Sequence, residues 1–205
     1  MLLTLLLACP APDEGADSGA TNDLSMLDVH GVEAPVDDDD ASPERGVVLS
    51  GSEYEYDWAV IRGWVKVDAA TMWQTVLNPD VAVNRRKVTE WTVTALDDEG
   101  VDEAYVVNEV VTDPIPVEYD LTWLHQGNET DGSIAVWEKT AGTDFVTLVR
   151  GGLTTVVVDD AIDFTAVFHL ATIDSDTADT ELFVQDFYAS VLAVAHGEPL
   201  PEWGE

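Results

Sequence analysis

The chain has 205 residues, and its 41 Asp and Glu against 8 Lys and Arg give a net charge of −33 at pH 7. Affinity for a polyanion is built from clustered Lys and Arg, so this balance excludes a nucleic-acid binder held by phosphate contacts. Hydrophobic residues nevertheless make up 46% of the chain, and it contains seven Trp. Chains too polar to fold lack such a content, so the composition predicts one folded domain with a tail.

The first nine residues form an apolar run that ends in the only cysteine of the chain, Cys9. A membrane-spanning helix needs roughly 20 residues, so this run is too short to cross a bilayer. Leu6-Leu7-Ala8-Cys9 resembles the lipobox of bacterial lipoproteins, although no Lys or Arg precedes the run. The resemblance implies a signal at residues 1–8 and acylation of Cys9. A chance Leu-rich start with a free Cys9 is the alternative.

The lipobox implies an extracytoplasmic, membrane-anchored lipoprotein. By analogy with enteric bacteria, the outer membrane is favoured, because Pro10 stands where an Asp would retain the protein in the inner membrane. A single cysteine also excludes an internal disulfide and a thiolate metal cluster.

Residues 9–52 are predicted to be a flexible acidic tether. Beyond Cys9 this segment holds four prolines, the run Asp37–Asp40, and eleven acidic residues against Arg45 alone. It shows no apolar periodicity, and such a composition favours an extended, self-repelling chain. The Asp run could bind calcium loosely, but a solvated acidic run is the simpler interpretation.

From residue 53 to residue 205 the sequence predicts a folded domain. Alternating apolar segments separated by turn residues predict strands, and helical spacing at 68–77 and 79–84 predicts two short helices, the first capped by Asp68. A longer helix is expected at 178–196, because its apolar residues recur on one side. The predicted strands are Tyr56–Val67, Lys87–Leu96, Glu103–Thr112, Val117–Gln126, Ser133–Thr140, Phe145–Val158 and Ile162–Ile173.

This order of elements resembles the helix-grip fold of the START and polyketide-cyclase-like superfamily (SRPBCC). The likeness is carried by Val65–Pro79, by the hairpin formed by Gly151–Val158 and Phe164–Leu170, and by the break at Asp113–Pro116, and it covers about residues 54–196. It implies an α+β domain in which a seven-stranded, curved antiparallel sheet wraps a long carboxy-terminal helix. Two short helices are expected between the first two strands. They argue against the alternative, an up-and-down lipocalin-type barrel.

The resemblance also implies an apolar cavity between the sheet and the last helix. Alternation predicts that odd positions face inward in 117–125 and even positions in 162–170, although such a stripe can equally be solid core. The candidate cavity residues are Tyr119, Trp123, His125, Arg150, Phe164, Phe168, Phe183 and Phe187.

Catalytic motifs are absent from the sequence. It has no Gly-x-Ser-x-Gly elbow and no His-Glu-x-x-His pair, so no catalytic residue, metal ligand or cofactor is predicted. His125 is expected on the inward register, where it could present a titratable group to a ligand. Arg150 is expected inward as well, and would there recognise an acidic ligand end.

The charge is divided between the tether and the domain. The tether holds eleven acidic residues and one basic residue, and the remainder holds 30 against seven, a net charge of −23. An acidic coat of this halophilic type suits solubility in a salty medium, and it disfavours docking on anionic lipid. The five basic residues Arg62, Lys66, Arg85, Arg86 and Lys87 are expected to form ion pairs rather than a free anion site.

Three functions remain open at this point. The first is a monomeric, Cys9-anchored protein that binds or carries a lipid-like, hydrophobic small molecule. The second is a cyclase- or aromatase-like enzyme, which would need His125 and Arg150 to converge in a pocket. The third is a cell-surface interaction domain with a solid core, which a large exposed apolar patch would favour.

Overall fold

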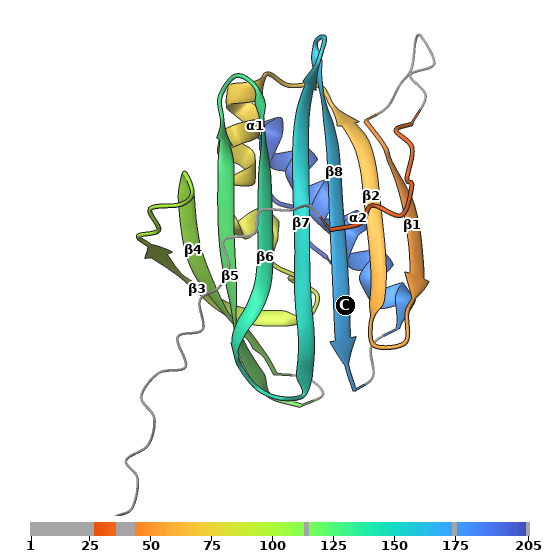
Figure 1. Ribbon diagram of the computed structural model, residues 1–205, viewed down its shortest axis with the longest axis vertical. Helices are drawn as coiled ribbons and strands as arrows, with labels where there is room; N and C mark the ends of the chain where they lie inside the picture. Colours follow the sequence, from red (N-terminus) through yellow and green to blue (C-terminus); the bar gives the residue numbers. More distant parts are fainter. Residues whose placement is uncertain (1–26, 36–43, 113–114, 174–175, 204–205) are drawn as a thin grey trace, which may run out of the picture.

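The computed structural model describes residues 27–35, 44–112, 115–173 and 176–203 (Figure 1). In the described part of the chain, neither helix has the length and apolar character that a membrane span requires. The elements are β1 (Gly46–Ser52), β2 (Asp57–Val65), α1 (Ala69–Val76), the 3-10 helix η1 (Pro79–Val81), β3 (Val88–Leu96), β4 (Glu103–Val111), β5 (Val117–Asn128), β6 (Gly132–Gly142), β7 (Val146–Val158), β8 (Ala161–Thr172) and α2 (Thr177–Ala195).

The strands form one antiparallel sheet in the order β1-β2-β8-β7-β6-β5-β4-β3. Strands β3 to β8 follow each other as hairpins, whereas β2 pairs with β8, at the far end of that series. The chain must therefore cross from one side of the sheet to the other between β2 and β3. Helices α1 and η1 make that crossing, which is why the sequence changes there from strand to helical spacing.

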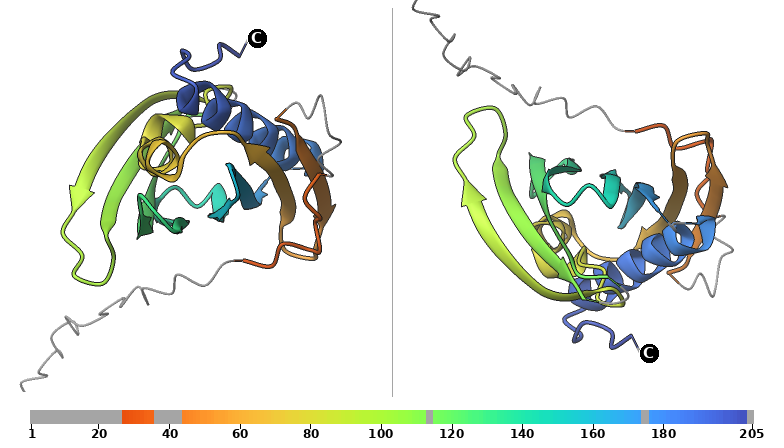
Figure 2. Two further views of the ribbon diagram at one scale, coloured as in Figure 1. Left: turned by 90° about the horizontal axis from the view of Figure 1, so that it is seen from above. Right: turned by 90° about the horizontal axis from the view of Figure 1, so that it is seen from below.

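Helix α2 lies across the concave face of the sheet, which bends around it when seen along the strands (Figure 2). Its first turn is capped by Asp176, whose Oδ1 accepts from the backbone N–H of Asp179 at 3.0 Å. Asp68 caps α1 in the same way, through Thr71 at 2.7 Å. Both caps satisfy backbone donors that the helix itself leaves unpaired.

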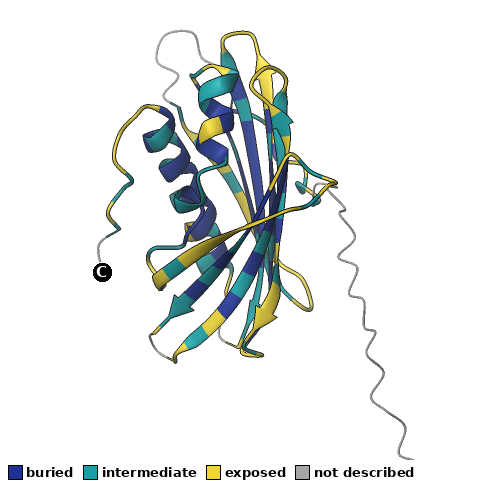
Figure 3. Ribbon diagram, turned by 90° about the vertical axis from the view of Figure 1, so that its left-hand side faces the viewer, coloured by how far each residue is buried: buried dark blue, intermediate teal, exposed yellow. Residues whose placement is uncertain are grey.

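Most of the buried apolar residues form one core between the sheet and the helices, and buried positions recur along the strands and along α2 (Figure 3). Phe164 on β8 is fully buried, and its ring meets Phe187 of α2 edge to face, with centroids 5.8 Å apart. Period-2 alternation on the strands and the apolar side of α2 thus produce one continuous core.

The expected α+β helix-grip fold is confirmed by this arrangement. The two α-helices and the six strands from β3 to β8 lie within a few residues of their predicted bounds. The predicted second short helix is a single 3-10 turn. The expected number of strands, seven, is wrong, because the described residues form eight.

The additional strand corrects the predicted tether, residues 9–52. Residues 46–52 form β1, which pairs with β2 along its whole length and contacts α2. Its apolar residues Val47, Val48 and Leu49 are consecutive, so it lacks the alternation typical of a half-buried strand, and as an edge strand it buries no residue fully.

A second part of the expected tether, residues 27–35, is here called the strap. It crosses the face of the sheet opposite α2 (Figure 1), where Val32 is buried against Val60 and Val167. Side chains of β2 also form hydrogen bonds with the backbone of the strap. Arg62 donates to the carbonyl of Val32 at 3.2 Å, and Trp64 donates to that of Pro35 at 2.8 Å. Both faces of β2 and β8 are therefore covered.

Candidate ligand-binding site

A cavity of about 370 Å³ lies between the sheet and the first turns of α2. Side chains of β4 to β8, of α2 and of the loop at 82–87 line it, and most of them are aliphatic or aromatic. Its volume falls within the range of small-molecule pockets. The space that could have been solid core is thus partly empty, as the carrier hypothesis requires.

Alternation along β5 explains how aromatic side chains reach the cavity. Tyr119, Leu121 and Trp123 all line it, while Asp120 points to the opposite face and accepts from Asn108 at 2.8 Å. On β8 the even positions Phe168 and Leu170 line it in the same way. The predicted inward faces of both strands are therefore confirmed.

The structure brings four of the eight candidate residues to the cavity wall: Tyr119, Trp123, Phe168 and Phe183. Phe168 and Phe183 meet there with ring centroids 4.0 Å apart, joining β8 to α2. Phe164 and Phe187 do not line the cavity and pack into the core instead. The prediction identified an inward face correctly, but parity alone does not tell a wall residue from a core residue.

His125 faces inward as predicted, but it lies in solid core rather than in the cavity wall. Its Nε2 is 3.1 Å from the hydroxyl of Tyr105, and its ring stacks on Trp123 with centroids 5.7 Å apart. Among the described residues, no hydrogen-bond partner lies near its Nδ1. Burial lowers the pKa of His125 to about 4, so the neutral imidazole is the form that the core holds.

The inward placement of Arg150 is wrong. Its register partner on β8 is His169, on the outer face, and its Nε donates to Nδ1 of His169 at 3.1 Å. A bulge between Val146 and Leu148 breaks the alternation of β7, so that Val146 and Val149 both line the cavity. The predicted parity did not include this extra residue. The guanidinium lies instead 5.6 Å from the ring centre of Tyr56.

His125 and Arg150 consequently lie on opposite faces of the sheet. The ring-closure hypothesis needed both side chains to converge on one ligand, and this pair does not.

Glu109 is a polar wall residue that the sequence analysis missed. It lies on β4, directly opposite Tyr119 on β5, and only 4% of its surface is exposed. The Tyr119 hydroxyl donates to its carboxyl group, yet burial dominates and raises the pKa of Glu109 to about 7. The same burial and the nearby carboxyl raise the pKa of Tyr119 well above its usual value.

A signal for Glu109 was present in the sequence. The segment 103–112 alternates, and Tyr105, Val107 and Val111 share one parity with Glu109. A single acidic residue on an otherwise apolar face is unusual for a strand, because a buried carboxyl without a partner is costly. Such a residue is a functional-site candidate.

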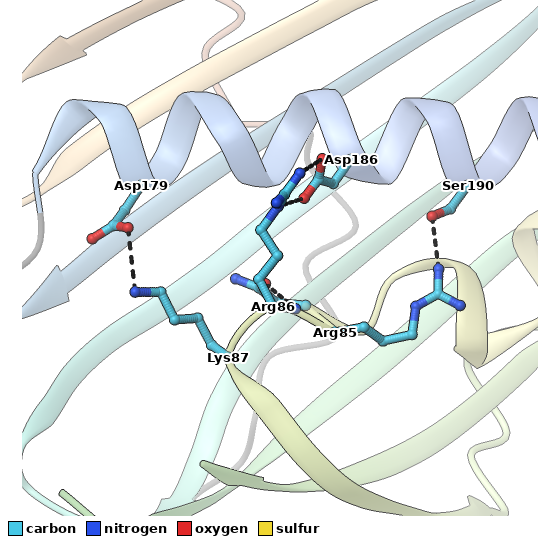
Figure 4. A network of polar contacts seen from close by, with 7 residues as sticks. Arg85, Arg86, Lys87, Asp179, Asp186 and Ser190 are labelled. Atoms are coloured by element: carbon cyan, nitrogen blue, oxygen red, sulfur yellow. Dashed lines mark hydrogen bonds and ion pairs between the residues drawn. The ribbon is translucent and has the colours of Figure 1, made fainter. Parts of the chain in front are cut away.

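The loop that precedes β3 attaches the sheet to α2 beside the cavity (Figure 4). Arg86 forms two hydrogen bonds with Asp186, at 2.5 and 3.1 Å. Lys87 Nζ lies 3.7 Å from Asp179, and Arg85 donates to Ser190 at 3.0 Å.

A further ion pair lies within the sheet, where Arg62 of β2 pairs with Asp163 of β8 at 2.6 Å. The predicted ion pairing is therefore confirmed for Arg62, Arg86 and Lys87, whereas the ion pairs found among the described residues do not include Lys66 or Arg85.

The cavity opens at the end of the sheet where α2 begins. Three apolar side chains that line it, from three different loops, are 48–68% exposed. They are Ile115, Phe145 and Ile173. These three side chains give the described part of the opening an apolar rim. The described residues contain no group of three His, Cys, Asp or Glu side chains that could hold a metal ion.

No family model matches the chain, and no curated protein matches it. Solved structures do match. Norcoclaurine synthase from Thalictrum flavum is 13% identical, with 75% of this chain and 99% of that chain covered and a TM-score of 0.44. A STAR-related lipid transfer protein from Xanthomonas axonopodis is 12% identical, with 74% and 97% covered and a TM-score of 0.43.

An aromatase/cyclase from a Streptomyces species is 9% identical, with 76% of this chain and 93% of that chain covered and a TM-score of 0.40. With TM-scores this low, the assignment of the fold depends on the topology of the chain itself. That topology decides it. The chain has the helix-grip fold. The helix-grip fold does not by itself determine a function, which depends on the residues of the cavity.

Proposed function

We propose that this protein binds and carries an apolar, lipid-like small molecule in the cavity between the sheet and α2. The observation that carries the proposal is the cavity of about 370 Å³, which is lined mainly by aliphatic and aromatic side chains. An empty apolar cavity loses dispersion contacts along its whole wall, so filling it with an apolar ligand is favourable. The exposed apolar side chains at the opening support the same function.

The proposal extends to the location of the protein. The Leu6–Cys9 motif favours a lipoprotein held at a membrane, outside the cytoplasm, by acyl chains on Cys9. Cys9 and the signal expected at residues 1–8 lie outside the described residues.

Native mass spectrometry of the full chain, followed by organic extraction, tests the binding function. A co-purifying adduct of lipid-like mass is expected, and the purified protein should bind the neutral apolar dye N-phenyl-1-naphthylamine. Val149 is 4% exposed and lines the cavity, so Val149→Phe should reduce dye binding at least about ten-fold by filling the space.

The matched control is Val156→Phe, on the same strand but 50% exposed, which should bind the dye as the wild type does. Thermal unfolding of both variants checks that they fold. The carrier function is refuted if the wild type shows neither adduct nor dye binding, or if the two variants bind the dye equally well.

A further inference from the structure

Glu109 places a carboxyl group in the wall of a cavity that is otherwise mainly apolar. Glu109 is buried, with only 4% of its surface exposed. The hydroxyl of Tyr119 is the hydrogen-bond donor beside its carboxyl group. An ionised carboxylate in such surroundings has lost its hydration, and one neutral donor replaces only part of it. The site therefore lacks a positive charge.

The described residues do not supply that charge. Of the described residues that line the cavity, Lys87 is the one with a basic side chain, and its ammonium group lies 3.7 Å from Asp179 at the edge of α2. The ion pairs seen within the described residues do not include Glu109. A ligand is thus the group best placed to bring a cation to this carboxyl.

We propose that the cavity selects a cationic amphiphile, an apolar molecule with one protonated amine, and that the amine pairs with Glu109 and Tyr119. The ammonium group donates to the Glu109 carboxylate and to the Tyr119 hydroxyl oxygen, while the apolar body fills the rest of the cavity. This inference rests on the proposed carrier function and specifies the chemical class of its ligand.

The charge of the whole chain favours the same class. A net charge of −33 attracts a cation and repels an anionic amphiphile such as a fatty acid. Inside the cavity, a ligand carboxylate would also face Glu109, and two like charges in low dielectric repel strongly.

Binding of an amine should depend on pH through Glu109. The ionisable groups lining the cavity with it are Tyr119 on β5, Lys87 before β3 and Asp179 on α2. Burial raises the pKa of Glu109 to about 7, so part of the protein must release a proton before the carboxylate can pair with an ammonium ion. Affinity for the amine should therefore rise between pH 6 and pH 8.

Isothermal titration calorimetry of the full chain with decylamine, decan-1-ol and decanoate tests the proposal. The three probes share one apolar chain and differ in the head group. The titrations are run at pH 8 in 0.3 M NaCl, because the salt screens attraction of the probes to the acidic surface. Under these conditions decylamine should bind at least about ten-fold more tightly than decan-1-ol, and decanoate should bind most weakly.

Glu109→Gln should remove the preference for the amine, lowering decylamine affinity at least about ten-fold and leaving decan-1-ol within about two-fold. The matched control is Glu118→Gln, an exposed residue on β5 whose carboxylate accepts from Asn108. It should keep the preference. Tyr119→Phe should weaken decylamine binding more than decan-1-ol binding.

Three outcomes would overturn the amine proposal. In the first, all three probes bind equally; in the second, Glu109→Gln keeps the amine preference; in the third, affinity for decylamine is the same at pH 6 and pH 8. In each of these cases the carrier function still stands. Failure of all three probes and of the neutral dye to bind would instead refute the carrier function, and the amine proposal with it.

Discussion

Two buried ionisable side chains, Glu109 and His125, show how much depends on the position of a single residue. Both lie on the inner face of neighbouring strands, and burial favours the neutral form of each. His125 is enclosed by Tyr105 and Trp123, where no ligand can reach it. Glu109 borders empty space. The same physical effect therefore makes one residue a core residue and the other a candidate for ligand recognition.

Replacing Glu109 with Gln should stabilise the protein in alkali. The folded-state pKa of Glu109, about 7, lies above its ordinary value of 4.5, so its contribution to stability is present below pH 4.5 and is lost as the pH rises through 7. Urea unfolding at pH 8.5 should show Glu109→Gln to be more stable than the wild type by on the order of 2 kcal/mol.

At pH 5 the two proteins should differ much less, because Glu109 is protonated in the folded state there. Glu118→Gln, which changes an exposed carboxylate, should show no such dependence on pH. An equal stability difference at pH 5 and pH 8.5 would contradict this account of Glu109.

At the scale of elements, the strap covers the outer face of the sheet at β2 and β8. The ring of His30 stacks on Trp58 of β2 at 3.6 Å, and His169 of β8 is only 3% exposed beneath this cover. Burial, aided by Arg150, lowers the pKa of His169 to about 4. The outer face of β2 and β8 thus forms a second, smaller core, separated by the sheet from the cavity.

Val32→Asp should detach the strap without emptying or closing the cavity. Val32 is 4% exposed against Val60 and Val167, so a charge at this position lowers stability by about 1–3 kcal/mol. Thermal unfolding and limited proteolysis of the strap measure the effect, and dye binding should be unchanged.

The control for the strap is Glu33→Gln, because Glu33 is exposed beside Val32. Resistance of the strap to protease in Val32→Asp would contradict the packing described here. Loss of dye binding would show that the two faces of the sheet are coupled.

At the scale of the whole molecule, the acidic charge bears on the proposed attachment to a membrane. Residues 53–205 carry a net charge of −23 and are repelled by anionic headgroups, so the proposed membrane location needs an attachment other than electrostatic attraction. A single acyl chain binds only marginally, whereas two chains give stable anchoring. The proposed acylation of Cys9 would provide such an attachment without a positively charged surface.

Cys9→Ser is accordingly expected to move the protein from the membrane fraction to the soluble fraction of a bacterial host that processes lipoproteins. Washing wild-type membranes with 1 M NaCl should leave the protein attached, because acyl chains are insensitive to salt. Release of the wild type by salt, or retention of Cys9→Ser in the membrane fraction, would refute anchoring through Cys9.

Much of the fold could be predicted from the sequence, because alternation and turn residues are local signals. The strands from β3 to β8 and the helix α2 follow directly from such patterns. Strand β1 and the strap could not be predicted in the same way. None of the residues of β1 is buried, and the strap buries Val32 only against Val60 and Val167, which lie far away in sequence.

The candidate site was predictable only in part. Tyr119, Trp123 and Phe168 follow from parity, which a strand preserves as long as it is regular, and Phe183 follows from the apolar side of α2. Arg150 does not, because the bulge in β7 reverses the parity after Val146.

The sequence by itself determined the element order, the inward faces of β5 and β8, and the acidic surface, since each depends on residue type and local spacing. Only the tertiary structure decided that space remains beside Glu109 while His125 and Phe164 are packed solid. Whether an inward side chain meets a cavity or another side chain depends on how far α2 lies from each strand. That separation is set by all the packed residues together, and it is not encoded at any single position.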